Sequence, residues 1–240
     1  SEFNGYQIQA KGERTVQGVV ESALSAMHGH SVTTYASGRT DSGVHADAQY
    51  LNFRTELDGI PAEKFALALN SHLPPDAKAQ SSREVDSSFH ARYSAMSRAY
   101  RYFLLPSATP IPKYRNYAHR IPDMPSVERL NAEASAFVGE HDFTTFAAAG
   151  QETAGNTRVV RGARFTHEPP FVVFWIRANG FLWKMVRSIV GTLTEREGRR
   201  LRSEPVDMSV QELLSSRRRD LAGTTAPARG LFLVDVEYDV

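Results

Sequence analysis

The chain alternates between segments with helical spacing and segments with strand-like spacing of apolar side chains. After Thr15, a residue type that caps helices, apolar positions recur every three or four residues as far as Met27. This spacing predicts a helix that ends near Gly29. Residues 47–54 alternate with period two and predict a strand, and Pro61 begins a second helix.

The second half repeats this alternation after a proline-rich connection at residues 106–112. The pattern predicts strands at 98–105, 159–165, 171–178 and 231–240, and helices at 126–138, 181 to about 197 and 210–214. We therefore predict an α+β fold with two α/β halves, residues 1–97 and 98–240. These halves are expected to share an antiparallel or mixed sheet with helices on one face.

One arginine stands out in the helix predicted from Phe181. Its apolar stripe consists of Leu182, Val186, Ile189, Val190 and Leu193. Arg187 lies at the edge of this stripe. Spacing alone allows two interpretations of Arg187: its stem covers the edge of the core, or its guanidinium reaches across a cleft.

The run from Gly38 to His45 places a carboxylate, a guanidinium and a glycine turn close together. Tyr35 to Ser37 predicts a short strand before it, and the composition from Thr40 to Gly43 is typical of a turn. An aspartate at such a turn can be presented at a cleft. The simpler interpretation is a hairpin with a surface Arg-Asp pair, worth roughly 0 to 1 kcal/mol.

Composition bounds the function class. With 240 residues and 41% apolar content, the chain can form one large or two ordinary domains. It contains no cysteine, which excludes disulfides and thiolate metal sites, and its histidines do not follow metal-binding spacings, so we predict no metal. We also expect no signal peptide and no membrane span, hence a cytoplasmic enzyme.

Charge gives a weaker indication. The net charge is only +1, but 23 of the 28 basic residues are arginines, by count along the sequence. Arginine offers a planar fork for phosphates and stacks on bases, which favours an RNA partner. A bias toward arginine codons explains the count equally well.

The string Gly38-Arg39-Thr40-Asp41-Ser42-Gly43-Val44-His45-Ala46 closely resembles the signature of the TruA family of tRNA pseudouridine synthases. Further stretches resemble the same family in the same order: 3–9, 15–17, 70–76, 89–92, 98–102, 139–143, 179–181, 185–191 and 226–231. The resemblance covers nearly the whole chain.

The resemblance implies the pseudouridine synthase fold, with a central cleft between two related halves and a mostly antiparallel sheet. It implies an isomerase that converts uridine to pseudouridine in the anticodon stem-loop of tRNA, around positions 38 to 40. It further implies a homodimer, and no redox, nucleotide or metal cofactor. The family also places a strand just before its opening motif, and we expect that strand to be missing because residues 1–9 match the middle of the motif.

By the same resemblance, Asp41 is the catalytic carboxylate, acting as nucleophile or base, and Arg187 is its ion-pair partner. Tyr100 matches the tyrosine that stacks on the everted base, although alternation along the strand would allow Tyr102 the same place. Arg39 would fill the gap left by the everted nucleotide or hold a neighbouring phosphate.

Two further residues have supporting roles in this interpretation. Leu231 matches an apolar residue that lines the family's pocket, and His45 is expected to support the loop.

Three alternatives remain open at this stage. The first is a related synthase that modifies other tRNA or RNA positions. The second is a non-catalytic RNA-binding module, because residues 161–165 faintly resemble a motif of such domains, without its stacking aromatics. The third is an α/β enzyme for small molecules, which the lack of a glycine-rich phosphate loop disfavours.

Overall fold

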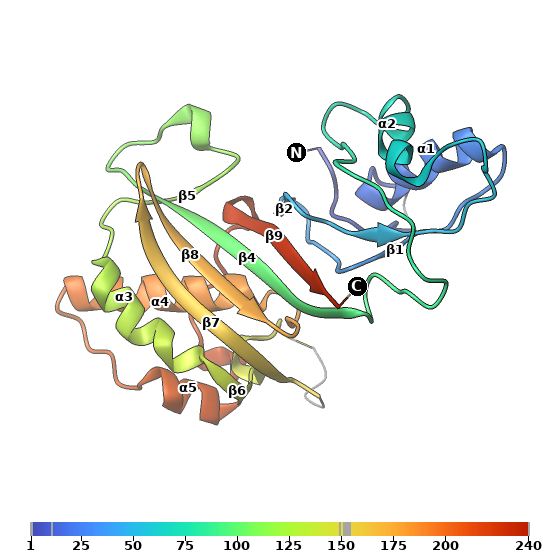
Figure 1. Cartoon of the computed structure of the whole chain (residues 1–240). Helices are drawn as coiled ribbons and strands as arrows, with labels where there is room; N and C mark the ends of the chain where they lie inside the picture. Colours follow the sequence, from blue (N-terminus) through green and yellow to red (C-terminus); the bar gives the residue numbers. More distant parts are fainter. Residues whose placement is uncertain (1, 11, 149, 151–154, 240) are drawn as a thin grey trace. The chain divides into compact units, whose positions relative to one another are not determined.

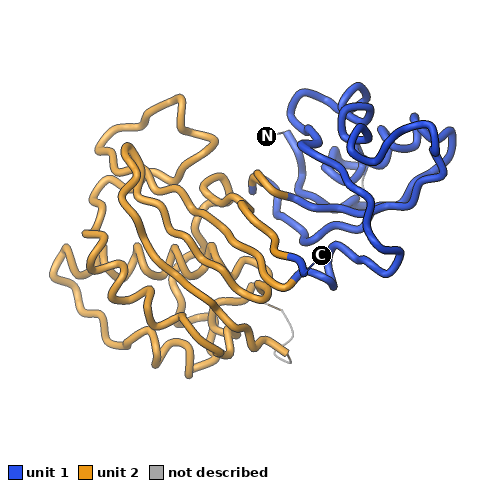
Figure 2. Tube along the Cα trace, in the orientation of Figure 1, with its two compact units in different colours: residues 1–44, 49–95, 238–240 blue, residues 45–48, 96–237 orange. Residues whose placement is uncertain are grey.

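The computed structural model describes residues 2–10, 12–148, 150 and 155–239. The chain divides into two compact units (Figure 2). The first comprises residues 1–44, 49–95 and 238–240, and the second comprises 45–48 and 96–237. In the described part of the chain, every helix is too short or too polar to cross a bilayer.

The first unit packs two helices and a small sheet around one core (Figure 1). Its elements are α1 (Val16–His28), the 3₁₀ turn Ala62–Lys64, α2 (Phe65–Asn70) and the antiparallel pair β1 (Tyr35–Ala36) and β3 (Leu51–Asn52). The core consists of Val20, Ala23, Leu24, Val32, Phe65, Leu69 and Leu73. Most of these side chains come from the apolar positions that predicted the two helices.

Helix α1 forms where the sequence predicts it. The Thr15 hydroxyl accepts a hydrogen bond from Gly18 N at 3.2 Å, which satisfies one of the unpaired donors of the first turn. Gly29 ends the helix in the left-handed conformation with φ +72°.

The second unit is built on a seven-stranded sheet in the order β2-β9-β4-β8-β7-β6, with β5 paired to β4. Its strands are β2 (His45–Ala46), β4 (Ala95–Pro106), β5 (His119–Ile121), β6 (Gly139–Asp142), β7 (Thr157–Glu168), β8 (Phe171–Ala178) and β9 (Leu231–Tyr238). The pairs β4-β8, β8-β7 and β7-β6 are antiparallel, whereas β2-β9 and β4-β5 are parallel. The predicted α+β class with a mostly antiparallel sheet is confirmed.

Helices α3 (Val127–Ala134), α4 (Met185–Leu201) and α5 (Val210–Ser216) complete the second unit (Figure 1). Helix α3 packs on β7 and on α4. The stripe predicted for α4 is buried throughout, from Leu182 to Leu193. Large aromatic side chains, among them Phe137, Phe143, Phe165 and Phe174, fill the same core.

Several boundaries differ from the prediction. Helix α4 begins at Met185 and not at Phe181, because Lys184 takes the left-handed conformation with φ +61°. The predicted strand 47–54 is reduced to Leu51–Asn52, since residues 45–48 belong to the second unit and 49–54 to the first. The short strands β5 and β6 were not predicted. Of the last predicted strand, Val240 lies outside the described residues.

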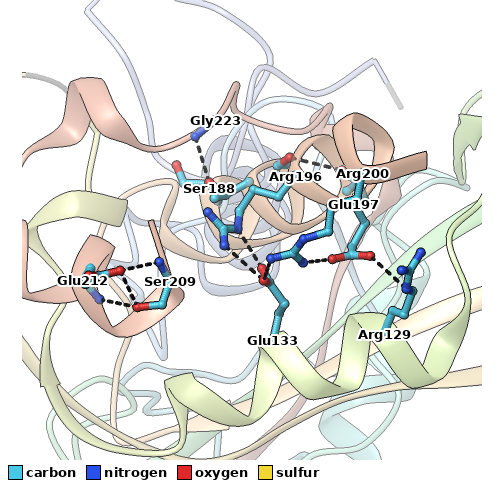
Figure 3. A network of polar contacts seen from close by, with 12 residues as sticks. Arg129, Glu133, Ser188, Arg196, Glu197, Arg200, Ser209, Glu212 and Gly223 are labelled. Atoms are coloured by element: carbon cyan, nitrogen blue, oxygen red, sulfur yellow. Dashed lines mark hydrogen bonds and ion pairs between the residues drawn. The ribbon is translucent and has the colours of Figure 1, made fainter. Parts of the chain in front are cut away.

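A network of ion pairs joins α3 to α4 (Figure 3). Glu133 on α3 accepts hydrogen bonds from Arg196 Nε at 2.7 Å and from Arg196 Nη2 at 3.0 Å, and Arg200 Nη2 lies 2.7 Å from it. Arg200 also pairs with the buried Glu197, which lies 3.9 Å from Arg129. The carboxylates alternate with guanidinium groups, so each charge in this network has an opposite neighbour.

The network predicts a pH-dependent stability. Burial alone raises the pKa of Glu133, but hydrogen bonds from Arg196 and Arg200 outweigh it and hold this pKa below its ordinary value of 4.5. Ionised Glu133 therefore stabilises the fold fully above pH 4.5, and the contribution is lost as the pH falls through the lowered folded-state pKa. We expect Glu133→Gln to reduce the free energy of unfolding by about 2 kcal/mol at neutral pH.

Urea unfolding of both proteins over a pH series measures this effect. The gap between wild type and Glu133→Gln should narrow as the solution is acidified, and a gap that stays constant would contradict the assignment. Glu204→Gln is a suitable control, because Glu204 pairs with Arg202 at the surface and its loss should change stability little.

Candidate active site

The loop that carries Asp41 lies between β1 and β2 and has the turn chemistry that its sequence predicts. The Asp41 carbonyl accepts a hydrogen bond from Val44 N at 3.1 Å, and Gly43 takes φ +80° inside the turn. The Asp41 side chain is half-buried, and Arg39 in the same loop is exposed. The turn therefore presents a partly covered carboxylate beside an accessible guanidinium.

The opening segment of the chain, residues 3–6, holds this loop from behind. Tyr6 N donates to Thr40 O at 3.0 Å, and the Ser42 hydroxyl donates to Phe3 O at 3.3 Å. Gly5 has φ +89°, and a Cβ there would lie 2.9 Å from Thr40 O and 3.2 Å from Ser42 N. Only glycine fits this conformation and this close approach.

Residues 3–6 are also bonded to the start of α1. Val16 N donates to Gly5 O at 3.2 Å, and Gln17 N donates to Tyr6 O at 2.9 Å, so two otherwise unpaired donors of the first helical turn are satisfied. The Asp41 loop is thus connected through a short extended segment to a helix with a buried face. Such backing fixes the main chain of a reactive side chain.

Gln49 braces the strand that leads into the loop. Its side-chain nitrogen donates to Gly38 O at 2.9 Å, and its oxygen accepts from the Ser37 hydroxyl at 2.5 Å. The period-two pattern of residues 47–54 does not reveal this role of Gln49, because the contact depends on how the chain returns after residue 41.

Arg187 occupies the first turn of α4 in the second unit and is half-buried. Its Nε donates to Ala226 O at 2.8 Å, and its own carbonyl accepts from Ala226 N at 3.1 Å. The first bond orients the side chain, and the second ties the main chain of the helix to the same residue. A carboxylate that pairs with Arg187 would then meet the terminal nitrogens of the guanidinium and not Nε.

Residues 222–227 run along α4 and are held by its polar side chains. Gly223 N donates to Thr192 Oγ1 at 3.0 Å, and Thr224 N donates to Glu195 Oε2 at 3.0 Å. At Gly191 the helix touches this segment directly, since a Cβ there would lie 1.8 Å from Thr224 O. The segment is therefore packed directly against α4 next to Arg187.

Residues 222–227 also contact the sheet, on which the candidate pocket residues lie. Tyr102 is fully buried, and its hydroxyl donates to Pro227 O at 2.7 Å. Burial raises its pKa well above the ordinary tyrosine value. Tyr102 is therefore a core residue, and Tyr100, which is half-buried and meets Phe181 edge-on at 5.1 Å, is the tyrosine with accessible surface. Leu231 begins β9 and is buried.

His45 has the supporting role predicted for it. Its Nε2 lies 2.8 Å from Asn116 O, and its ring stacks on Phe232, its neighbour in the β2-β9 pairing, with centroids 4.5 Å apart. Burial lowers its pKa, although hydrogen bonding to Asn116 acts in the opposite direction. The His45 side chain thus anchors the chain just after the Asp41 loop.

The predicted site residues fall into two groups. Asp41 and Arg39 belong to the first unit, and Tyr100, Arg187 and Leu231 belong to the second. The ion pair between Asp41 and Arg187 stays a prediction. Among the described residues, no group of three or more histidine, aspartate or glutamate side chains is arranged to hold a metal ion.

Comparison with known proteins identifies the family. A profile of the tRNA pseudouridine synthases matches residues 1–94 and 134–239. A tRNA pseudouridine synthase A of Treponema denticola is 42% identical over 240 residues, covering 98% of this chain and 88% of the relative. Enzymes of the same name from Bacillus pumilus and Halalkalibacterium halodurans are 41% and 43% identical, covering 99% and 96% of this chain and 94% and 86% of the relatives.

This chain belongs to the tRNA pseudouridine synthase family. The family membership confirms the resemblance found in the sequence and the predicted enzyme class, an isomerase that converts uridine to pseudouridine. The Asp41 loop with its backing lies within the first matched region, and the α4 segment with Arg187 lies within the second. The sequence predicted the candidate site residues but not the residues that position them. Gly5 could have been noticed in the sequence, since a glycine inside a family motif often marks a place where two segments of main chain approach closely.

Proposed function

We propose that this synthase isomerises uridine in the anticodon stem-loop of tRNA, around positions 38 to 40, with Asp41 as the catalytic carboxylate. The reaction breaks the bond from C1′ of the ribose to N1 of uracil, turns the base, and joins C1′ to C5. N1 gains a proton and C5 loses one, so no oxidant or reductant is needed. Asp41 acts as nucleophile or base in this exchange.

The other candidate residues complete the site. Arg187 is proposed as the ion-pair partner of Asp41, because a guanidinium is a suitable partner for a partly buried carboxylate. Tyr100 stacks on the everted base, Leu231 lines the pocket, and Arg39 fills the gap in the RNA or holds a phosphate. A homodimer and a cytoplasmic location, both implied by the family, stay predictions.

The observation that carries the proposal is the support of the Asp41 loop. A surface hairpin with an incidental Arg-Asp pair has no need of a glycine pressed on its backbone, of two hydrogen bonds from residues 3–6, or of a helix behind them. Rigid backing of one half-buried carboxylate is what a nucleophile or base requires.

Tritium release from tRNA tests the proposal directly. Unmodified tRNA transcripts labelled at C5 of uridine are incubated with the protein without added cofactor, in parallel with transcripts that carry cytidine at positions 38 to 40. We expect release from the first transcript only. Equal tritium release from both transcripts would show that the enzyme acts on a uridine outside positions 38 to 40. Retention of RNA on a filter without tritium release would indicate a non-catalytic binding module.

Arg187→Ala is expected to lower kcat by about 10² to 10³-fold while the Kd for tRNA changes little, because a preorganised charge partner acts on the reacting groups. Arg187→Lys retains the charge but not the Nε bond to Ala226, so it should lie between wild type and Arg187→Ala. Single-turnover rates and filter binding measure the two quantities.

Arg202→Ala serves as the matched control, since Arg202 follows the end of the same helix, is exposed and pairs with Glu204. Its rate should equal that of wild type. An unchanged rate in Arg187→Ala would remove Arg187 from the site.

A further inference from the structure

Three aromatic rings that have no role in the proposed catalysis lie next to one another on the first unit. Tyr35 of β1 lies 5.1 Å from His90, and His90 lies 4.4 Å from Tyr93, measured between ring centroids. Tyr35 is 50% exposed and Tyr93 is 76% exposed. We call Tyr35, His90 and Tyr93 the aromatic array. Exposed aromatics in contact with one another are a binding feature more often than single ones.

The loop that carries His90 and Tyr93 is held by hydrogen bonds to other parts of the first unit. Ala91 N donates to the Asn52 side-chain oxygen at 2.8 Å, and the Asn52 side-chain nitrogen donates to Phe89 O at 3.4 Å. The Tyr238 hydroxyl donates to Ala91 O at 2.7 Å. Asn52 is the β3 partner of Tyr35, so one residue ties both parts of the array together. The backbone that carries the rings is therefore held in place by hydrogen bonds before any ligand binds.

His90 is fixed in one tautomer. Its Nδ1 lies 3.1 Å from Arg92 N and 3.4 Å from Tyr93 N, and backbone nitrogens of this kind can only donate. Nδ1 is thus the acceptor and the ring proton is on Nε2. The array then combines aromatic faces with an imidazole donor and two phenolic hydroxyls.

Arginine adds a positive charge to the same surface. The guanidinium of the exposed Arg92 lies 5.5 Å from the centroid of the Tyr93 ring. Ordered aromatic faces next to a guanidinium are the features with which proteins hold unpaired nucleotides, because every base has a π face and every phosphate a negative charge. An apolar protein partner would instead favour a surface without these polar groups.

The array is also close to the Asp41 loop along the chain. Tyr35 and Asp41 are joined by the segment from β1 through Gly38, and a chain of this length spans at most about 20 Å. Stacked nucleotides rise about 3.4 Å each, so this span corresponds to roughly six of them. A ligand strand with its target base at Asp41 can therefore reach the array within the same stem-loop.

We propose that Tyr35, His90 and Tyr93 form a stacking platform for unpaired nucleotides of the substrate RNA beside the target uridine. The inference rests on the proposed function for its ligand class. Removing one aromatic platform residue weakens single-strand binding by about 1 to 3 kcal/mol per base, which is about 5- to 150-fold in Kd.

The experiment compares two RNA hairpins with the same stem. One has an open loop of cytidines, which no uridine chemistry can alter, and the other is closed by a short, structured loop. In fluorescence anisotropy, Tyr93→Ala and Tyr35→Ala should each raise the Kd for the open-loop hairpin about 5- to 150-fold and leave the Kd for the closed one nearly unchanged. Tyr93→Phe, which keeps the ring, should bind as wild type does.

Leu67→Ala is the matched control, because Leu67 is 70% exposed on the same unit and lies outside the array. It should bind both hairpins normally. Normal binding of the open loop by both tyrosine-to-alanine variants overturns the platform, and so does an equal loss for both hairpins. Light scattering tests the remaining possibility, since a change of oligomeric state in Tyr93→Ala would make the array an interface between copies and overturn the proposal.

These outcomes are separable from the proposed function. Tritium release by wild type together with normal binding by both tyrosine variants would refute the platform alone. Selective loss of open-loop binding in a protein that releases no tritium would refute the isomerase alone.

Discussion

Asp41→Ala is expected to abolish tritium release, with a fall in kcat of at least about 10⁴-fold, while the protein still binds tRNA with nearly its normal affinity. The chemistry has one proposed nucleophile or base, and its loss leaves only binding and orientation to act on the glycosidic bond. Affinity should persist, because phosphate contacts supply most RNA binding and a carboxylate supplies none.

Two related variants sharpen this result. Asp41→Asn keeps the shape of the side chain and removes the charge, so it should be as inactive as Asp41→Ala. Asp47→Asn removes an exposed carboxylate a few residues further on and should leave the rate unchanged. Parallel loss of turnover, RNA binding and thermal stability in Asp41→Ala would show that Asp41 has a structural role.

Gly191→Ala should destabilise the second unit by more than about 3 kcal/mol and greatly reduce activity. Helix propensity alone predicts the opposite, a gain of about 1 kcal/mol for alanine within a helix. Packing decides the outcome, because the new Cβ would lie 1.8 Å from Thr224 O and 3.0 Å from Ala226 N, both main-chain atoms. The segment 222–227 must shift, and Arg187 loses its bond to Ala226.

Gly198→Ala on the same helix is the matched control. The nearest atom to a Cβ at Gly198 is Arg202 Nη1 at 3.5 Å, an ordinary contact. Here propensity should prevail, and stability should stay the same or rise by up to about 1 kcal/mol. Thermal and urea unfolding compare the two variants, and similar stabilities would contradict the packing argument.

The sequence predicted what depends on local periodicity and capping. Helix α1 followed from its apolar spacing between Thr15 and Gly29, and the stripe of α4 is buried as expected. The start of α4 could not be found from periodicity, because the left-handed turn at Lys184 is compatible with the same apolar pattern. The division of residues 45–54 between two units depends on tertiary pairing, which alternation does not report.

For the candidate site as well, local motifs were predictable from the sequence and tertiary contacts were not. The family motifs predict Asp41, Arg187 and Tyr100 as site residues, and this assignment stays a prediction. Alternation alone could not separate Tyr100 from Tyr102, which the structure distinguishes by the full burial of Tyr102. The contacts of Gly5 with Thr40 and of Gly191 with Thr224 join residues far apart in the chain. A single sequence shows the glycines but not their neighbours.

The contact of residues 3–6 with the Asp41 loop has a consequence for genetic screens. In a screen for inactive mutants, substitutions at Gly5 should be recovered alongside substitutions at Asp41. Gly5 has no reactive group and lies far from Asp41 in the sequence, but its backbone contacts the Asp41 loop. Revertants of such a mutant should appear among residues 40–42, where small backbone adjustments can make room again. Mutations at residues 3–6 should therefore be selected against for the same reason as mutations in the Asp41 loop.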